Sequence, residues 1–134
     1  MFRKLLLTCF AAALFSGCNE KTTQPNSDID AAHTFIKYIQ ENNFEAAENI
    51  ILKDQENKAS LIKLKKAAES KSAAELDQYK NADIIIDELS PVNDSVTIVH
   101  YAISSNKAQK NKLKLIKRNG QWLVDLKYTF SGNL

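Results

Sequence analysis

The hydrophobic residues of this 134-residue chain change their spacing once, after Lys80. Between residues 28 and 80 they recur every three or four positions, which is the spacing of one face of an α-helix. From residue 81 onward they alternate with polar residues, as in a strand with one buried face. A single switch from helical to strand spacing predicts an α+β domain, with helices laid on one face of an antiparallel sheet.

The helical part is expected to contain three stretches. Ser27 begins a Ser-x-x-acid sequence, a variant of the capping box, and predicts a first helix over residues 28–41. Asn42 predicts the cap of a short second helix, and Asp54 opens a longer third stretch. Ser72 could restart that third stretch as a separate turn.

Strands are expected over residues 81–89, 95–104, 112–118 and 121–130. The last two flank Asn119-Gly120, the strongest short-range signal of a hairpin. Counting outward from this turn predicts three cross-strand pairs: Leu115 with Val124, Leu113 with Leu126, and Lys114 with Asp125. The core-facing side of the last strand is expected to include three aromatic residues: Trp122, Tyr128 and Phe130.

The chain begins with a short basic segment, residues 1–4, followed by 11 mainly apolar residues over 5–15. A helix needs roughly 20 apolar residues to span a bilayer, so this run has the size of a signal-peptide core. It ends at Phe15-Ser16-Gly17-Cys18, which resembles the signal of bacterial lipoproteins, in which a cysteine after small residues is lipidated on sulfur and becomes the N-terminus.

This resemblance implies a signal peptide over residues 1–17 and lipidation of Cys18. Residues 18–27 are then the lipidated cysteine followed by a flexible polar tether. Phe15 departs from the family, which usually has Leu at this place. A plain secretory signal cut elsewhere and a buried N-terminal helix are the alternatives. Because residue 19 is Asn and not the Asp that retains lipoproteins at the inner membrane of enteric bacteria, the resemblance implies a lipid anchor in the cell envelope at the outer membrane.

Removal of the signal peptide leaves a mature chain without net charge. It takes away Arg3 and Lys4, which leaves 16 of the 18 basic residues against 16 acidic ones. A neutral chain has no long-range field to attract nucleic acid, so no nucleic-acid partner is expected. With Cys9 removed and Cys18 lipidated, the domain over residues 28–134 can form neither an internal disulfide nor a thiolate zinc site.

Two segments of this domain resemble one family of small bacterial lipoproteins. Residues 35–47 look like its Phe-rich first helix and the start of its second, and residues 113–125 look like its closing hairpin. The family is the domain of unknown function 4878, within the nuclear transport factor 2-like, cystatin-like superfamily. The resemblance implies N-terminal helices packed on a curved antiparallel sheet of about four strands, in a cone that encloses a cavity. It implies no activity, since the superfamily includes both enzymes and noncatalytic binding modules.

Four side chains are expected to line such a cavity: Phe35, His100, Trp122 and Tyr128. His100 shares its alternation set with Val96, Ile98 and Ala102, and imidazole can exchange a proton near neutral pH. A half-exposed histidine without such a role is the simpler alternative. The sequence assigns no catalytic residue, metal or cofactor, because it has no HExxH, CxxC, phosphate-binding glycine loop or Gly-x-Ser-x-Gly motif.

Two functions of different classes follow. The first is a noncatalytic envelope module that binds a small apolar molecule or another envelope protein while its N-terminal lipid holds it to the membrane. The alternative is a small isomerase or dehydratase with His100 as its base. The two differ in one feature, because acid–base catalysis needs a second positioned polar group. A carboxylate within about 4 Å of the His100 ring in a closed pocket would favour the enzyme.

Overall fold

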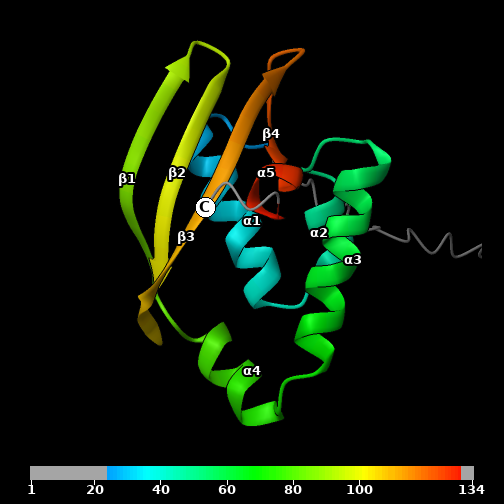
Figure 1. Ribbon diagram of the computed structural model, residues 1–134, viewed down its shortest axis with the longest axis vertical. Helices are drawn as coiled ribbons and strands as arrows, with labels where there is room; N and C mark the ends of the chain where they lie inside the picture. Colours follow the sequence, from blue (N-terminus) through cyan, green and yellow to red (C-terminus); the bar gives the residue numbers. More distant parts are fainter. Residues whose placement is uncertain (1–23, 131–134) are drawn as a thin grey trace, which may run out of the picture.

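The structure, a computed structural model, describes residues 24–130, with side chains through residue 129 (Figure 1). Four helices precede the sheet: α1 (Asp28–Gln40), α2 (Phe44–Glu48), α3 (Gln55–Glu69) and α4 (Ala73–Lys80). The strands and a last short helix follow: β1 (Ile84–Asn93), β2 (Val96–Ile103), β3 (Asn106–Arg118), β4 (Gln121–Asp125) and α5 (Leu126–Phe130). The predicted α+β class and the antiparallel four-stranded sheet are therefore confirmed.

Side-chain caps set where the helices begin. Ser27 accepts a hydrogen bond from the Asp30 backbone N–H at the start of α1, as the sequence predicts. The cap of α2 is Asn43 and not Asn42, because Asn42 takes a left-handed φ of 56° in the turn that ends α1. Ser72 and its partner three residues later form a complete capping box, which makes α4 a separate helix and not a continuation of α3.

The strands pair in the order β1-β2-β3-β4. The hairpin at Asn119-Gly120 has φ values of 50° and 76°, as a tight turn of this kind requires. Two of the predicted cross-strand pairs are confirmed: Leu115 with Val124 and Lys114 with Asp125. The free edge of β4 is covered by residues 50–52, whose backbone exchanges hydrogen bonds of 2.9 and 3.0 Å with Val124.

The predicted last strand is wrong beyond Asp125. There the Leu126 N–H donates to the Asn57 side chain of α3 and not to a neighbouring strand, and residues 126–130 form α5. The expected pairing of Leu113 with Leu126 is therefore absent, and Tyr128 lies on a helix. The other strands also differ in their bounds: β1 begins at Ile84 and not at residue 81, and it continues through Pro91, while β3 begins six residues before the expected start.

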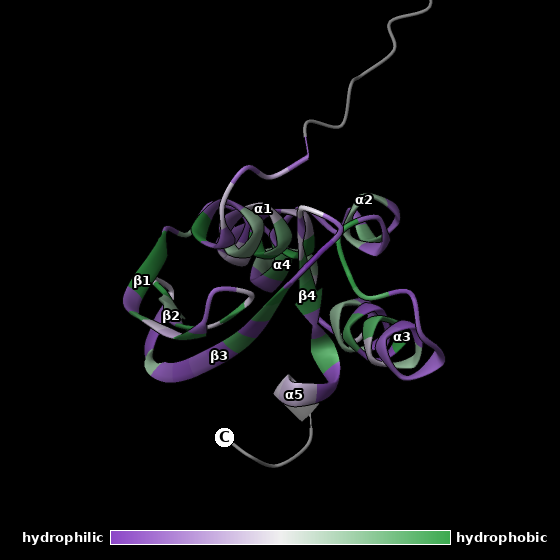
Figure 2. Ribbon diagram, turned by 90° about the horizontal axis from the view of Figure 1, so that it is seen from above, coloured by the Kyte–Doolittle hydropathy of each residue, from purple (hydrophilic) through white to green (hydrophobic). Residues whose placement is uncertain are grey.

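One hydrophobic core lies between α1 and the sheet, and Figure 2 shows α1 beside the strands when the molecule is seen from above. Its buried members come from α1, α2, the segment after α2, α3, β2, β3, β4 and α5: Ala31, Ala32, Phe35, Ile36, Ala47, Ile50, Ile51, Leu61, Val99, Ile103, Leu113, Leu115, Val124 and Leu126. The apolar stripe predicted for the first helix thus becomes the layer that covers the inner face of the sheet.

Candidate functional site

The side chains of β2 divide into two faces, and His100 lies on the outer one. Thr97, Val99 and Ile103 are 1%, 0% and 5% exposed and face α1 and the core. The predicted inward set is therefore wrong for Val96, Ile98 and His100, which are half-buried on the other face, whereas Ala102 is 1% exposed. Both sets are largely apolar, so alternation alone does not choose between them. The hydrogen bond of 2.7 Å from the Thr97 hydroxyl to the Asp28 carboxylate in α1 identifies the inner face.

His100 has no carboxylate partner. It is half-buried, and its cross-strand neighbours are Glu88 on β1 and Lys112 on β3. The Glu88 carboxylate accepts a hydrogen bond of 2.7 Å from the Ser90 hydroxyl. Within residues 24–130 no ion pair includes His100, so no carboxylate oxygen lies within 4.0 Å of its ring nitrogens. The arrangement at His100 is therefore not that of an acid–base pair in a closed pocket.

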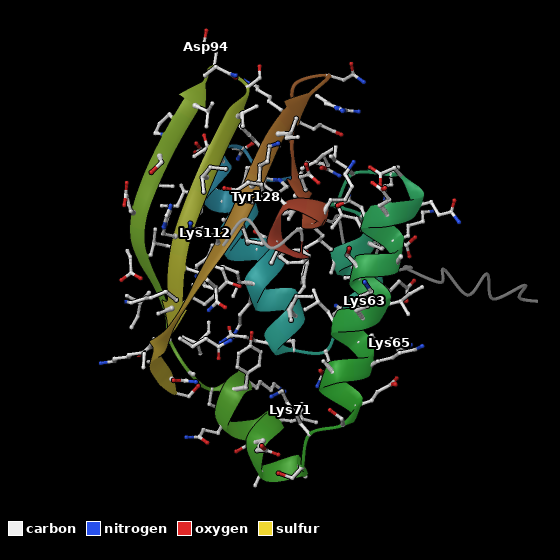
Figure 3. The ribbon with its side chains drawn as sticks, viewed as in Figure 1. Lys63, Lys65, Lys71, Asp94, Lys112 and Tyr128 are labelled. Carbon is white, nitrogen blue, oxygen red and sulfur yellow. The ribbon has the colours of Figure 1, made fainter. Side chains whose placement is uncertain are left out.

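The structure does not bring the four expected cavity residues together. Phe35 is 2% exposed in the core, and Trp122 packs against that core from β4 while remaining half-buried. Tyr128, labelled in Figure 3, lies on α5 with the Lys114 Nζ atom 5.7 Å from its ring centroid. Lys114 is on the outer face of β3, so Tyr128 is near the outer side of the sheet. Phe35 and Trp122 share the core, whereas His100 and Tyr128 do not.

A hollow of about 180 Å³ lies where the turn after α1 meets α3 and α4. We call it the α3–α4 hollow. Its lining combines three apolar and three polar residues: Phe44, Ala68 and Leu76 with Asn42, Lys65 and Glu69. Lys65 and Glu69 are exposed, and in the part of the chain that the structure describes neither takes part in an ion pair. The hollow can thus hold a small apolar group with a charged end near its rim.

Local structure explains why the sequence did not reveal this hollow. Phe44, Ala68 and Leu76 recur at helical spacing with other apolar residues, and spacing of this kind does not distinguish a fully covered face from the wall of a hollow. The left-handed turn at Asn42 and the break between α3 and α4 keep these three side chains half-buried and not fully covered. A sequence signal does exist, namely the Ser72 capping box that separates the two helices, but spacing does not predict how far apart they stand.

A buried polar group lies beside this hollow. Gln40, 1% exposed at the end of α1, donates hydrogen bonds of 2.9 Å to the backbone carbonyls of Tyr79 and Ala82. Its Oε1 atom has no hydrogen-bond partner among the described residues. Burial raises the pKa of both Tyr79 and the neighbouring Tyr101, so their phenols stay neutral at physiological pH. These groups can donate or accept hydrogen bonds, but none is suited to act as a base.

The most connected polar side chain is structural. Asn57 is 0% exposed, and its side chain bonds to Asp54, to Asp125 and to the Leu126 N–H. Hydrogen bonds from Asn57 hold the pKa of Asp54 below its ordinary value. On the surface beside it, a bond to Glu56 and the charge of Asp54 raise the pKa of Lys127. This cluster fixes α3 against β4 and α5.

Residues 24–130 contain no group of three or more His, Cys, Asp or Glu side chains placed to hold a metal ion. In the same stretch no helix is both long and apolar enough to cross a bilayer. The predicted signal peptide, Cys18 and the first part of the predicted tether lie outside the described residues.

Comparison of the chain with protein-family models, with curated proteins and with solved structures gives no match.

Proposed function

We propose that this chain is a lipid-anchored protein of the bacterial cell envelope whose folded domain binds a small apolar ligand or another envelope protein without catalysis. The observation that supports binding most directly is the α3–α4 hollow, with its apolar lining and the charged side chains of Lys65 and Glu69. Ligand sites are concave and mostly apolar, with a few polar groups that orient the ligand.

The anchor is supported by the order of three features at the N-terminus. A basic start, an apolar run too short to span a bilayer and a cysteine after two small residues follow one another over residues 1–18. Growth of the producing bacterium with an alkyne fatty acid tests the anchor. Wild type should take up the label and fractionate with membranes, and Cys18→Ala should do neither. An unlabelled wild type contradicts the anchor.

The noncatalytic assignment is supported by the surroundings of His100. Catalysis of the isomerase or dehydratase kind needs a base and a second positioned group in a water-excluding site. His100 faces outward between Glu88 and Lys112 and has no carboxylate within 4.0 Å among the described residues. The enzyme remains the alternative function, and it has no support from this geometry.

Filling the hollow tests the binding site. Ala68→Leu adds apolar volume to its lining, and Ala59→Leu adds the same volume at an exposed position of the same helix. The probe is anilinonaphthalene sulfonate, which has an apolar ring system and an anionic group that Lys65 can attract. Its fluorescence should rise with wild type and Ala59→Leu and stay low with Ala68→Leu, at equal melting temperatures. Equal titrations for both variants would show that the hollow is not the site.

We also propose that the fold is the cone of the nuclear transport factor 2-like superfamily. Two observations support it: the helices precede a four-stranded antiparallel sheet, and α1 packs across the inner face of that sheet. An experimental structure of the domain tests this, and a sheet that does not curve around α1 would contradict it.

A further inference from the structure

The exposed apolar side chains of the domain gather at one end. Among the described residues, large hydrophobic side chains with more than about a third of their surface exposed occur at Ile29, Ile62, Leu89 and Val92. Their exposed fractions are 39%, 54%, 40% and 63%. Ile62 stands alone on the outer side of α3. The other three belong to the N-terminal end of α1 and to β1.

The neighbours of these three residues place them at one end of the molecule. The Asp28 carboxylate, next to Ile29, accepts the bond of 2.7 Å from the Thr97 hydroxyl. Thr97 is the cross-strand partner of Pro91, which lies between Leu89 and Val92 in β1. The turn between β1 and β2 stands at this end, where Asp94 is labelled in Figure 3.

The hairpin between β3 and β4 belongs to the same end. The Lys117 N–H donates a hydrogen bond of 2.8 Å to the Ser95 carbonyl, which brings the two strand turns together (Figure 1). The charged residues near the apolar ones are of both signs, with acids in excess: Asp28, Asp30, Glu88 and Asp94 against Lys117 and Arg118. This excess of acids disfavours a strongly anionic surface, whereas headgroups with both a phosphate and an amine can meet charges of either sign.

The position of Cys18 brings this same end to the membrane. Nine residues separate Cys18 from the first residue of α1, and the ten Cα–Cα steps between them span at most about 36 Å. The opposite end of α1 leads into Asn42 and the α3–α4 hollow. Since α1 has 13 residues, that end lies about 20 Å further from the anchor along the helix.

We infer that the end formed by Ile29, Leu89 and Val92 rests on a zwitterionic lipid surface, with these side chains at the level of the headgroups. The inference depends on the proposed lipidation of Cys18. It gives the anchored domain one orientation, in which the α3–α4 hollow points away from the bilayer toward its ligand. The lipid on Cys18 holds the domain at the bilayer, and apolar side chains at the interface favour the orientation in which they face the headgroups.

A fluorescent probe at each end of the domain tests this orientation. In the full lipidated protein, Cys9 has been removed and Cys18 is blocked, so a cysteine introduced at Val92 or at Lys71 is the only thiol. Val92 is 63% exposed and Lys71, labelled in Figure 3 at the end near α4, is exposed as well. Val92→Cys and Lys71→Cys are labelled with an environment-sensitive dye and reconstituted in phosphatidylcholine vesicles with or without nitroxide lipids.

The dye at position 92 should shift to shorter wavelength and lose roughly half of its emission to nitroxide lipids, as expected for a group within the interface. The dye at position 71 should do neither. Weak and equal quenching at both positions, in protein that has taken up the fatty-acid label at Cys18, would overturn the orientation and leave the anchor intact. An unlabelled Cys18 would instead overturn the proposed anchor. A wavelength shift at position 92 that depends on protein concentration and not on vesicles would show that a second copy covers this end.

Discussion

Replacement of Asn57 by Ala removes the polar connection between α3 and the end of the sheet. The Asn57 Nδ2 atom donates to the Asp54 carboxylate at 2.9 Å and to the Asp125 carboxylate at 3.4 Å, and its Oδ1 atom accepts from the Leu126 N–H. The side chain is 0% exposed, so water cannot replace it without a rearrangement. The backbone N–H of residue 57 still donates to Asp54 in the variant, so the cap of α3 survives.

The destabilisation follows from the groups that lose their partners. A buried donor left unsatisfied, here the Leu126 N–H, costs about 1–3 kcal/mol. Asp125, 6% exposed, loses one long hydrogen bond, and this loss adds about 1 kcal/mol to the destabilisation. The ion pair of Asp125 with Lys114, at 3.7 Å, remains. Ala has a higher helix propensity than Asn, which offsets roughly 0.5 kcal/mol. The free energy of unfolding should therefore fall by about 1.5–3.5 kcal/mol.

Urea unfolding followed by circular dichroism measures this change, with Gln55→Ala as the matched control. Gln55 is an exposed amide in the first turn of the same helix, and its replacement should change the free energy of unfolding by less than about 0.5 kcal/mol. The slope of the free energy of unfolding against urea concentration (the m-value) should be the same for both variants. If Asn57→Ala is as stable as Gln55→Ala, the assigned network does not hold α3 to β4.

Three further predictions concern the sheet and the cap of α3. In urea titrations, Leu115→Ala should lower the free energy of unfolding by about 2–5 kcal/mol, because Leu115 is 0% exposed. Trp122→Ala, at a half-buried site, should lower it by only about 1–2 kcal/mol. A larger loss for Trp122→Ala than for Leu115→Ala would contradict the assigned core. Changing Asn119 and Gly120 to Ala together should lower the melting temperature, because Ala at positive φ costs about 1 kcal/mol per residue; an unchanged melt would refute the turn. Hydrogen bonds with Asn57 lower the pKa of Asp54 below 3.8, so its stabilisation is present above that pH and is lost as the pH falls toward the lowered pKa. Asp54→Asn should therefore lose less stability than wild type between about pH 5 and pH 2 in thermal melts, and equal losses would contradict the assigned bonds.

Features that depend on neighbouring residues in the sequence could be predicted. Ser27 and Asp54 cap helices because a short polar side chain before an apolar stripe satisfies free N–H groups locally. The turn at Asn119-Gly120 and the pairing of Leu115 with Val124 follow from the backbone conformation of the turn alone. Such signals need no knowledge of the rest of the fold.

Features that depend on distant contacts could not be predicted. The face of β2 that turns inward is set by α1, about 70 residues away, through Asp28 and Thr97, so His100 was placed on the wrong side. Likewise the last strand ends at Asp125 because Asn57 takes the next N–H, and no local signal announces that bond. The α3–α4 hollow depends on the separation of two helices and was missed for the same reason.

The mass of the N-terminal peptide of the mature protein tests the proposed membrane anchor most directly. The protein is extracted from the membranes of the producing bacterium, digested, and its N-terminal peptide is analysed by mass spectrometry. The account predicts a peptide that begins at Cys18, lacks residues 1–17 and has a diacylglyceryl group on the cysteine sulfur. A peptide that contains Gly17 joined to an unmodified Cys18, or a mature N-terminus at another residue, would contradict it.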